Sequence, residues 1–196
     1  MDDNTITIVS GLPRSGTSMM MRMLDEGGLE PLTDNIRTPD EDNPKGYYEY
    51  ERVKGLPEDV GWLPGAKGKV VKVLAELIKY LPEGHNYRIV FMMRNIDEIV
   101  SSQKKMMIRR GEDPEAVPEK EMADLLRRYL VLLKQTVNSR SDMDVLYISY
   151  NDLMTDPEMA VTEIGDFFDD RIDKGSMLES IDPKLYRNRA VWQDDS

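Results

Sequence analysis

The 196-residue chain contains no cysteine and only one histidine. Without thiols it can form neither a disulfide nor a thiolate metal site, and one histidine is too few for a histidine-rich metal centre. No apolar run approaches the ~18 residues that a membrane-spanning helix needs. The acidic N-terminus leads directly into an expected strand, which is not the pattern of a signal peptide. We therefore expect a cytoplasmic protein that binds no metal and no membrane.

Positive charge is also scarce, because 26 Lys and Arg stand against 37 Asp and Glu, giving a formal net charge of −11. A surface this acidic disfavours broad binding to nucleic acid or to an anionic membrane. An anionic small molecule would instead need a locally positive pocket. The 40% apolar and 32% charged content is that of a globular protein. The length suits one domain spanning residues 1–196, and no feature indicates the oligomeric state.

The stretch Gly11-Leu-Pro-Arg-Ser-Gly-Thr-Ser18 has the G-x-x-x-x-G spacing of a P-loop, between an apolar run and a helical pattern. In P-loops that use ATP or GTP, lysine follows the second glycine and the next Ser or Thr holds Mg²⁺. Here Thr17 takes the place of that lysine, and the nearest cation is Arg14, inside the loop. Backbone amides and the helix N-terminus still predict an anion site. The alternative interpretation is a glycine-rich turn without a ligand.

Strands and helices alternate along the rest of the chain. We expect buried strands at 6–9, 70–73, 88–93 and 145–149, and helices at 18–26, 75–81, 95–110, 122–137 and 156–168. Residues 33–68 and the tail at 170–196 are expected to be mostly irregular. Asn95 and Glu98 have the spacing of a capping box. The alternation predicts an α/β fold of three layers, P-loop NTPase-like, with a central parallel sheet flanked by helices.

Polar residues follow the predicted strands at their carboxyl ends, where open parallel sheets bind ligands. They are Arg14, Lys72, Arg94 and Tyr150. Arg94 stands where many NTPases place a Mg²⁺-binding aspartate, so its charge favours an anion over a metal. Ser102 lies about two turns into the following helix, on a face that returns near the start of that helix.

Taken together, these residues resemble the sulfotransferase family that uses 3′-phosphoadenosine 5′-phosphosulfate (PAPS), over about residues 5–168. The loop at 13–18 looks like the family's 5′-phosphosulfate loop, and Arg94 with Ser102 looks like its 3′-phosphate pair. Residues 150–153 look like its Tyr-Glu-Asp-Leu segment, and residues 70–72 look like its strand that ends in a lysine. Residues 43–49 look like an acceptor-side segment that ends in a glutamate.

The resemblance implies transfer of a sulfuryl group from PAPS to a hydroxyl or amine of a small-molecule acceptor, without a metal. Adenosine 3′,5′-bisphosphate would be the product. The implied catalytic residues are Arg14, Lys72, which offsets charge on the leaving group, and Glu49, which accepts the proton. The implied cofactor-binding residues are Pro13, Arg14, Ser15, Gly16, Thr17, Ser18, Arg94, Ser102, Tyr150, Arg187 and Arg189.

Some of these roles have plain alternatives. Lys72 could be a surface lysine with its head in water, and Glu49 could be one more acid in an acidic loop. The tail lacks the glycine-containing basic segment of the family's cytosolic members, which leaves the roles of Arg187 and Arg189 open.

Two other functions fit the sequence. A small-molecule or nucleoside kinase with a degenerate P-loop would need Mg²⁺, which Asp152 could hold. A non-catalytic nucleotide-binding module would keep the pocket without turnover. The acceptor is not identified, since the aromatic residues of 33–68 suggest a ring-bearing compound and the acidic residues suggest an amine.

Overall fold

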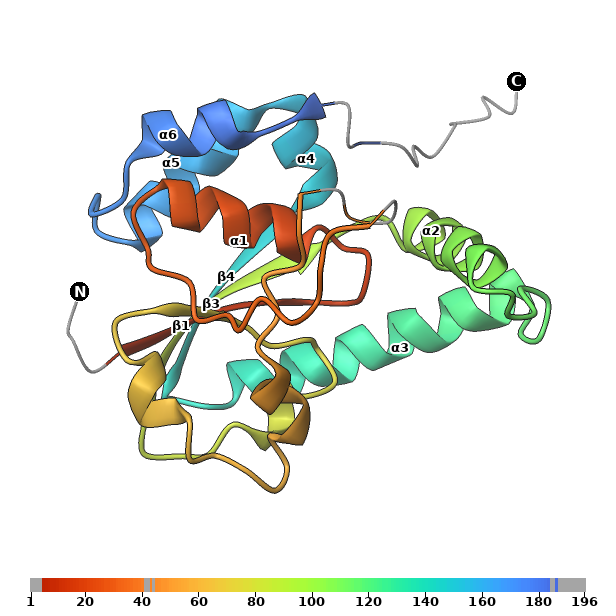
Figure 1. The fold of residues 1–196 in the computed structure, drawn as a ribbon, viewed down its shortest axis with the longest axis horizontal. Coiled ribbons are helices and arrows are strands. Elements are labelled where there is room, and N and C mark those ends of the chain that lie inside the picture. The colour runs from red at the N-terminus through yellow and green to blue at the C-terminus, as the bar shows by residue number, and fades with distance from the viewer. Residues whose placement is uncertain (1–4, 41–42, 44, 184–185, 187–196) are drawn as a thin grey trace.

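The computed structural model describes residues 5–40, 43, 45–183 and 186. Its centre is a sheet of four parallel strands in the order β2-β1-β3-β4 (Figure 1). The strands are β1 (Thr5–Gly11), β2 (Val70–Lys72), β3 (Asn86–Met93) and β4 (Met143–Ser149). The predicted α/β fold with a central parallel sheet is confirmed.

Helices cover both faces of the sheet (Figure 1). One apolar core lies under α1 (Thr17–Glu26), α4 (Tyr150–Thr155), α5 (Pro157–Phe167) and α6 (Lys174–Ser180). The other lies under α2 (Ile96–Arg109), α3 (Glu119–Asn138) and the short 3₁₀ helices η1 (Glu51–Gly55), η2 (Leu63–Ala66) and η3 (Ile78–Tyr80). Within the described residues, no helix is both long and apolar enough to cross a bilayer.

The central strands explain why the apolar runs were continuous. In β3, Ile89 and Phe91 pack into one core, whereas Val90 and Met92 pack into the other. Successive side chains of a strand point to opposite faces, so a strand covered on both sides needs an apolar residue at every position. All four of these side chains are at most 1% exposed.

Two sequence expectations were wrong. Residues 75–81 form turns and the 3₁₀ helix η3 rather than an α-helix, because so short a segment gains little from helix propagation. The tail contains α6, which was expected to be irregular. Asp173 caps α6 by accepting hydrogen bonds from the amides of Gly175 and Ser176, and Met177 is fully buried beside α1.

Candidate active site

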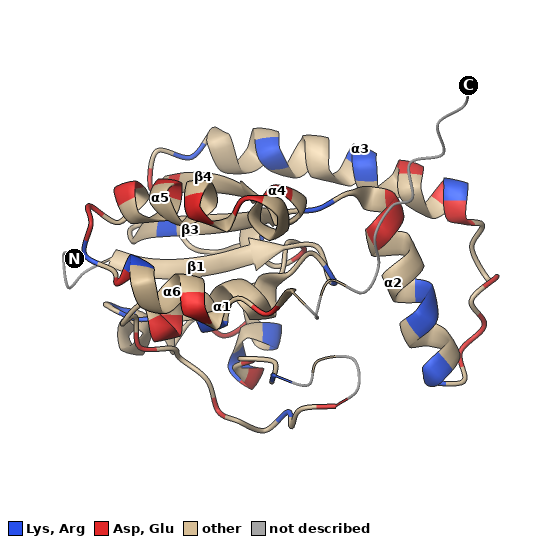
Figure 2. Ribbon diagram, turned by 90° about the horizontal axis from the view of Figure 1, so that it is seen from above, with Lys and Arg blue, Asp and Glu red and all other residues tan. Residues whose placement is uncertain are grey.

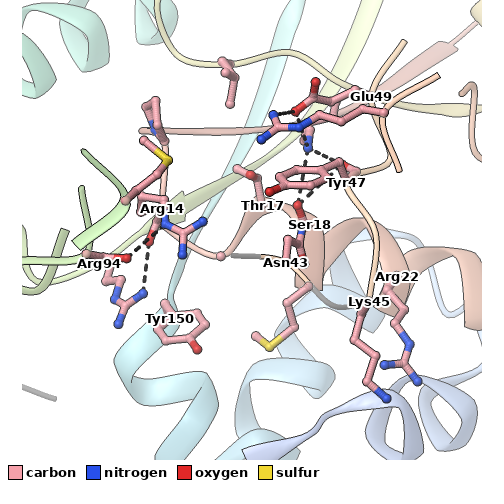
Figure 3. A pocket seen from close by; sticks show the side chains of 18 of the residues that line it. Arg14, Thr17, Ser18, Arg22, Asn43, Lys45, Tyr47, Glu49, Arg94 and Tyr150 are labelled. Atoms are coloured by element: carbon pink, nitrogen blue, oxygen red, sulfur yellow. Dashed lines mark hydrogen bonds and ion pairs between the residues drawn. The ribbon is translucent and has the colours of Figure 1, made fainter. Parts of the chain in front are cut away.

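The carboxyl ends of the strands open into a cavity of about 490 Å³ (Figure 3). This volume falls within the range of small-molecule sites, ~300–1,000 Å³. Its wall includes the phosphate loop, the ends of β2 and β3, and parts of α1, α2 and α4. Among the described residues, nine Lys or Arg line it against two Asp or Glu, in a chain whose net charge is −11. The locally positive pocket that an anionic ligand would need is therefore present.

The phosphate loop is built from two residues with left-handed backbone conformations. Arg14 has a φ of 74°, which strains the backbone of a residue that carries a side chain, and Gly16 has a φ of 99°. Gly16 is the N-cap of α1, and no side chain caps the helix there. The first amides of a helix have no partner within it, so those of α1 are available to an anion.

The loop also explains why Gly16 must lack a side chain. A Cβ atom at this position would overlap the Tyr150 ring. Tyr150 is 4% exposed and stacks against the Arg94 guanidinium, whose Cζ is 4.4 Å from the ring centroid. The ring therefore fixes the helix start and the strand-end arginine at the same time. Burial raises the pKa of Tyr150, which keeps the phenol protonated.

Most of the predicted loop residues line the cavity: Pro13, Arg14, Gly16, Thr17 and Ser18. Ser15 is different. It is fully buried, its amide donates to the Leu12 carbonyl, and its hydroxyl lies against Gly11 rather than facing the cavity. The Ser15 side chain therefore does not line the cavity, and the role of Ser15 in cofactor binding stays a prediction.

Hydrogen bonds join the loop to the end of β3 and to α2. Arg14 Nε donates to Ser102 Oγ over 2.9 Å, and Arg94 Nη1 donates to the Arg14 carbonyl over 3.0 Å. Ser102 is 2% exposed, yet it lines the cavity together with both arginines. The side chains of the predicted pair, Arg94 and Ser102, thus meet the phosphate loop at one place.

Glu98 does not complete the predicted capping box. Asn95 does cap α2, since its Oδ1 accepts from the amides of Asp97 and Glu98. The Glu98 carboxylate turns inward, however, and pairs with Arg94 Nε at 2.9 Å, while the Asn95 amide donates to Asn151 Oδ1. Because both partners are buried, the pair holds the Arg94 guanidinium in a fixed position.

Lys72 ends β2 and is 5% exposed, so it is not a surface lysine. Its Nζ hydrogen-bonds the Tyr47 carbonyl and lies 3.7 Å from Glu49 Oε1. Burial lowers the pKa of Lys72 to about 8, and the nearby Glu49 carboxylate partly opposes that shift. Ser18 Oγ also donates to the Tyr47 carbonyl, over 3.4 Å.

The predicted base, Glu49, lies beside Lys72. The Glu49 carboxylate pairs with Arg37 Nη1 at 2.7 Å, and its side chain is 17% exposed. The Arg37 guanidinium stacks on the Tyr47 ring, with Cζ 3.3 Å from the centroid. Burial and a hydrogen bond to Asp40 raise the pKa of Tyr47 to about 12, so its phenol stays protonated at neutral pH.

Several cavity residues were not predicted from the sequence: Arg22, Arg37, Lys45, Lys105, Arg109 and Arg110. Helical spacing could have found part of this set. Arg22 lies four residues after Ser18 on α1, and Lys105 lies three after Ser102 on α2, so each shares a helix face with a predicted site residue. Arg37 follows no such pattern. Arg187 and Arg189 lie outside the described residues.

Comparison with known proteins decides the family. A model described as the sulfotransferase family matches residues 47–173. The chain belongs to this family. No curated protein sequence matches it.

Solved sulfotransferase structures share its fold. The sulfotransferase domain of the Synechococcus PCC 7002 olefin synthase is 16% identical, with a TM-score of 0.59, over 98% of this chain and 90% of that one. The sulfotransferase domain of the curacin biosynthetic pathway is 14% identical, with a TM-score of 0.53, over 91% and 78%. The sulfotransferase STF9 of Mycobacterium avium is 14% identical, with a TM-score of 0.50, over 89% and 67%. At these identities the comparison shows the shared fold alone.

Proposed function

We propose that this sulfotransferase moves a sulfuryl group from PAPS to a hydroxyl or amine of a small-molecule acceptor. The observation that carries the proposal is the hydrogen bond between Arg14 and Ser102. It brings two predicted anion-binding groups, the phosphate loop and the Arg94–Ser102 pair, to one cavity. A donor with phosphate groups at both its 3′ and 5′ positions matches two such groups better than ATP does.

The residues of the cavity fit this donor. The first backbone amides of α1, which have no partner within the helix, and the Arg14 guanidinium would hold the phosphosulfate. Arg94, held in place by Glu98, and Ser102 would hold the 3′-phosphate. When bound, the donor supplies the sulfuryl group and is released as adenosine 3′,5′-bisphosphate.

Lys72 and Glu49 would carry the proton and charge chemistry. A Glu49 oxygen takes the proton that the acceptor hydroxyl or amine loses as it bonds to sulfur. Lys72 Nζ, buried at the end of β2, offsets the charge that develops on the departing phosphate oxygen. The 3.7 Å between Lys72 Nζ and Glu49 Oε1 keeps both groups at one transfer centre.

The position of Asp152 argues against the kinase alternative. This residue is exposed on α4 and does not line the cavity, so it is poorly placed to hold Mg²⁺ for a bound nucleotide. The residue directly after Gly16 is Thr17 rather than the lysine of ATP-using P-loops. A non-catalytic nucleotide-binding module would share the cavity, and only turnover separates it from the enzyme.

Isothermal titration tests the donor assignment. Adenosine 3′,5′-bisphosphate and ADP are each titrated with and without Mg²⁺, into the wild type, Arg14→Ala and the control Lys79→Ala, an exposed residue away from the cavity. We expect tight, metal-independent binding of the bisphosphate that is weakened only in Arg14→Ala. A preference for ADP with Mg²⁺ would overturn the proposal in favour of a kinase. A [³⁵S]PAPS transfer assay then separates the enzyme from a binding module.

A further inference from the structure

The cavity holds more positive charge than the donor requires. Arg14, Lys72 and Arg94 already serve the donor in the proposed function. Six further cations, which we call the outer cations, line the same cavity. They are Arg22, Arg37, Lys45, Lys105, Arg109 and Arg110.

The outer cations come from three segments that are distant in the sequence. Arg22 lies on α1, and Arg37 and Lys45 lie in the irregular segment before η1. Lys105 and Arg109 lie in the last turns of α2, and Arg110 is its C-cap. Figure 3 shows Arg22 and Lys45 beside one another, away from Arg94. Figure 2 shows basic residues along the C-terminal part of α2. Convergence from separate elements is not explained by one basic stretch of sequence.

Carboxylates neutralise only part of this charge. Two of the described residues in the cavity wall are acids: Glu49 pairs with Arg37 at 2.7 Å, and Asp182 lies 4.0 Å from Lys45. Within the described part of the chain, Arg22 and Arg110 form no hydrogen bond or ion pair through their side chains. Cations gathered in one cavity repel one another unless an anion enters, so the outer cations favour a second negatively charged ligand.

The negative charge of the donor would balance only part of the positive charge in the cavity. Its 3′-phosphate carries about −1.5 to −2 charges at neutral pH, and the phosphosulfate adds its own negative charge. Both groups have dedicated partners in the loop amides, Arg14, Arg94 and Ser102. Among the described outer cations, Arg22 and Arg110 in particular therefore remain for the other substrate.

We propose that the acceptor itself is an anion: a hydroxyl compound that also bears a carboxylate, phosphate or sulfate group. The proposal rests on the proposed function and names the substrate class for the same site. The outer cations bind the acceptor's anionic group while its hydroxyl reaches Glu49. A cationic amine is disfavoured, because it would enter a cavity that already repels it.

Matched acceptor pairs test the proposal. Transfer from PAPS is measured for glucose against glucose 6-phosphate, and for 4-methylphenol against 4-hydroxybenzoate. The wild type is compared with Arg22→Gln, Arg110→Gln and the control Arg128→Gln, an exposed arginine on α3 away from the cavity. We expect kcat/KM at least about tenfold higher for the anionic member of a pair, since a hydrogen bond to a charged group contributes about that factor. The preference should shrink in Arg22→Gln or Arg110→Gln, mainly through KM, and persist in Arg128→Gln.

Equal or better transfer to the neutral members would overturn the proposal. If neither pair is turned over, thermal unfolding of the bisphosphate-bound protein is measured with each of the four compounds. Selective stabilisation by the anionic members, lost in the two cavity variants, supports the proposal, and equal shifts overturn it. Failure of the protein to bind adenosine 3′,5′-bisphosphate would instead overturn the proposed function, so the two failures are distinguishable.

Discussion

Arg14 Nε donates a hydrogen bond to Ser102 Oγ over 2.9 Å, joining two residues that lie 88 positions apart in the sequence. The bond fixes the middle of the phosphate loop against the second turn of α2. Because the Arg14 backbone is in the left-handed region, its side chain is held both by the loop conformation and by this partner. The loop and α2 therefore act as one rigid wall of the cavity.

Replacing Ser102 with alanine should weaken binding of adenosine 3′,5′-bisphosphate. The variant removes the partner of Arg14 and a hydroxyl that faces the cavity, and the dissociation constant should rise about tenfold. Isothermal titration measures the change. Ser101→Ala is the matched control, since Ser101 is adjacent but does not line the cavity. Equal affinities of the two variants would show that Ser102 does not contact the ligand.

Gly16→Ala should disrupt the site through the Tyr150 ring. Gly28 provides an unusually close control, because it has the same φ of 99° but no atom lies within 4 Å of the place that a Cβ would take. Both alanine variants carry the left-handed backbone strain. Gly16→Ala alone also meets an aromatic ring, which should cost about 1–3 kcal/mol more of unfolding free energy. Urea titrations of both variants measure this difference, and equal losses would exclude the contact with Tyr150.

Loss of the Lys72 charge should lower kcat at alkaline pH, which gives the pH profile of kcat an alkaline limb. The pKa of Lys72 is lowered to about 8 by burial, so its positive charge is lost as the pH rises through that value. We expect kcat to fall between pH 8 and 10 at saturating substrates. Lys72→Arg keeps the charge across this range and should remove the limb, even if it lowers the maximum rate. An unchanged limb in that variant would assign the titration to another group.

The same titration should affect stability in the opposite direction. The unfolded chain retains the Lys72 proton up to about its usual pKa of 10.5, whereas the folded protein releases it near 8. Between these values the unfolded state binds more protons, so Lys72 makes the unfolding free energy rise with pH. Comparing the pH dependence of urea unfolding for the wild type and Lys72→Met isolates this contribution. The wild type should gain stability relative to the variant over that window.

Glu49→Gln should lower turnover while nearly preserving the affinity for adenosine 3′,5′-bisphosphate. The amide keeps the shape of the side chain and can still accept a hydrogen bond from Arg37, but it cannot take a proton. A loss of about 10²–10⁴-fold in kcat is typical of a removed general base. Glu51→Gln, two residues away and exposed, is the control. Normal turnover of Glu49→Gln would refute the assignment of the base.

The sequence predicted the elements whose signals are local. β3 is a continuous apolar run because both of its faces are buried, and α2 begins at Ile96 because the side chain of Asn95 caps it. The α6 helix was missed because it is only seven residues long and depends on Asp173 and on packing of Met177. The inward turn of Glu98 could not be predicted either, since its partner Arg94 belongs to the end of a different element.

The same distinction separates the predicted from the missed site residues. Arg14, Lys72 and Arg94 follow strands, and parallel strands deliver their carboxyl ends to one edge of the sheet. Arg37 lies in an irregular segment whose path depends on tertiary contacts, among them its own stacking on Tyr47. No periodicity in the sequence could have brought it to Glu49.

The partner that Lys72 and Ser18 share is a main-chain oxygen, that of Tyr47. A carbonyl is present whatever residue occupies the position, so mutation of the side chain alone leaves the acceptor of both hydrogen bonds in place. Related chains could therefore diversify the side chains of this segment over evolutionary time while it stays attached to the lysine. The Arg37–Glu49 pair, which depends on two side chains, would be lost by a single nucleotide change that removed either one.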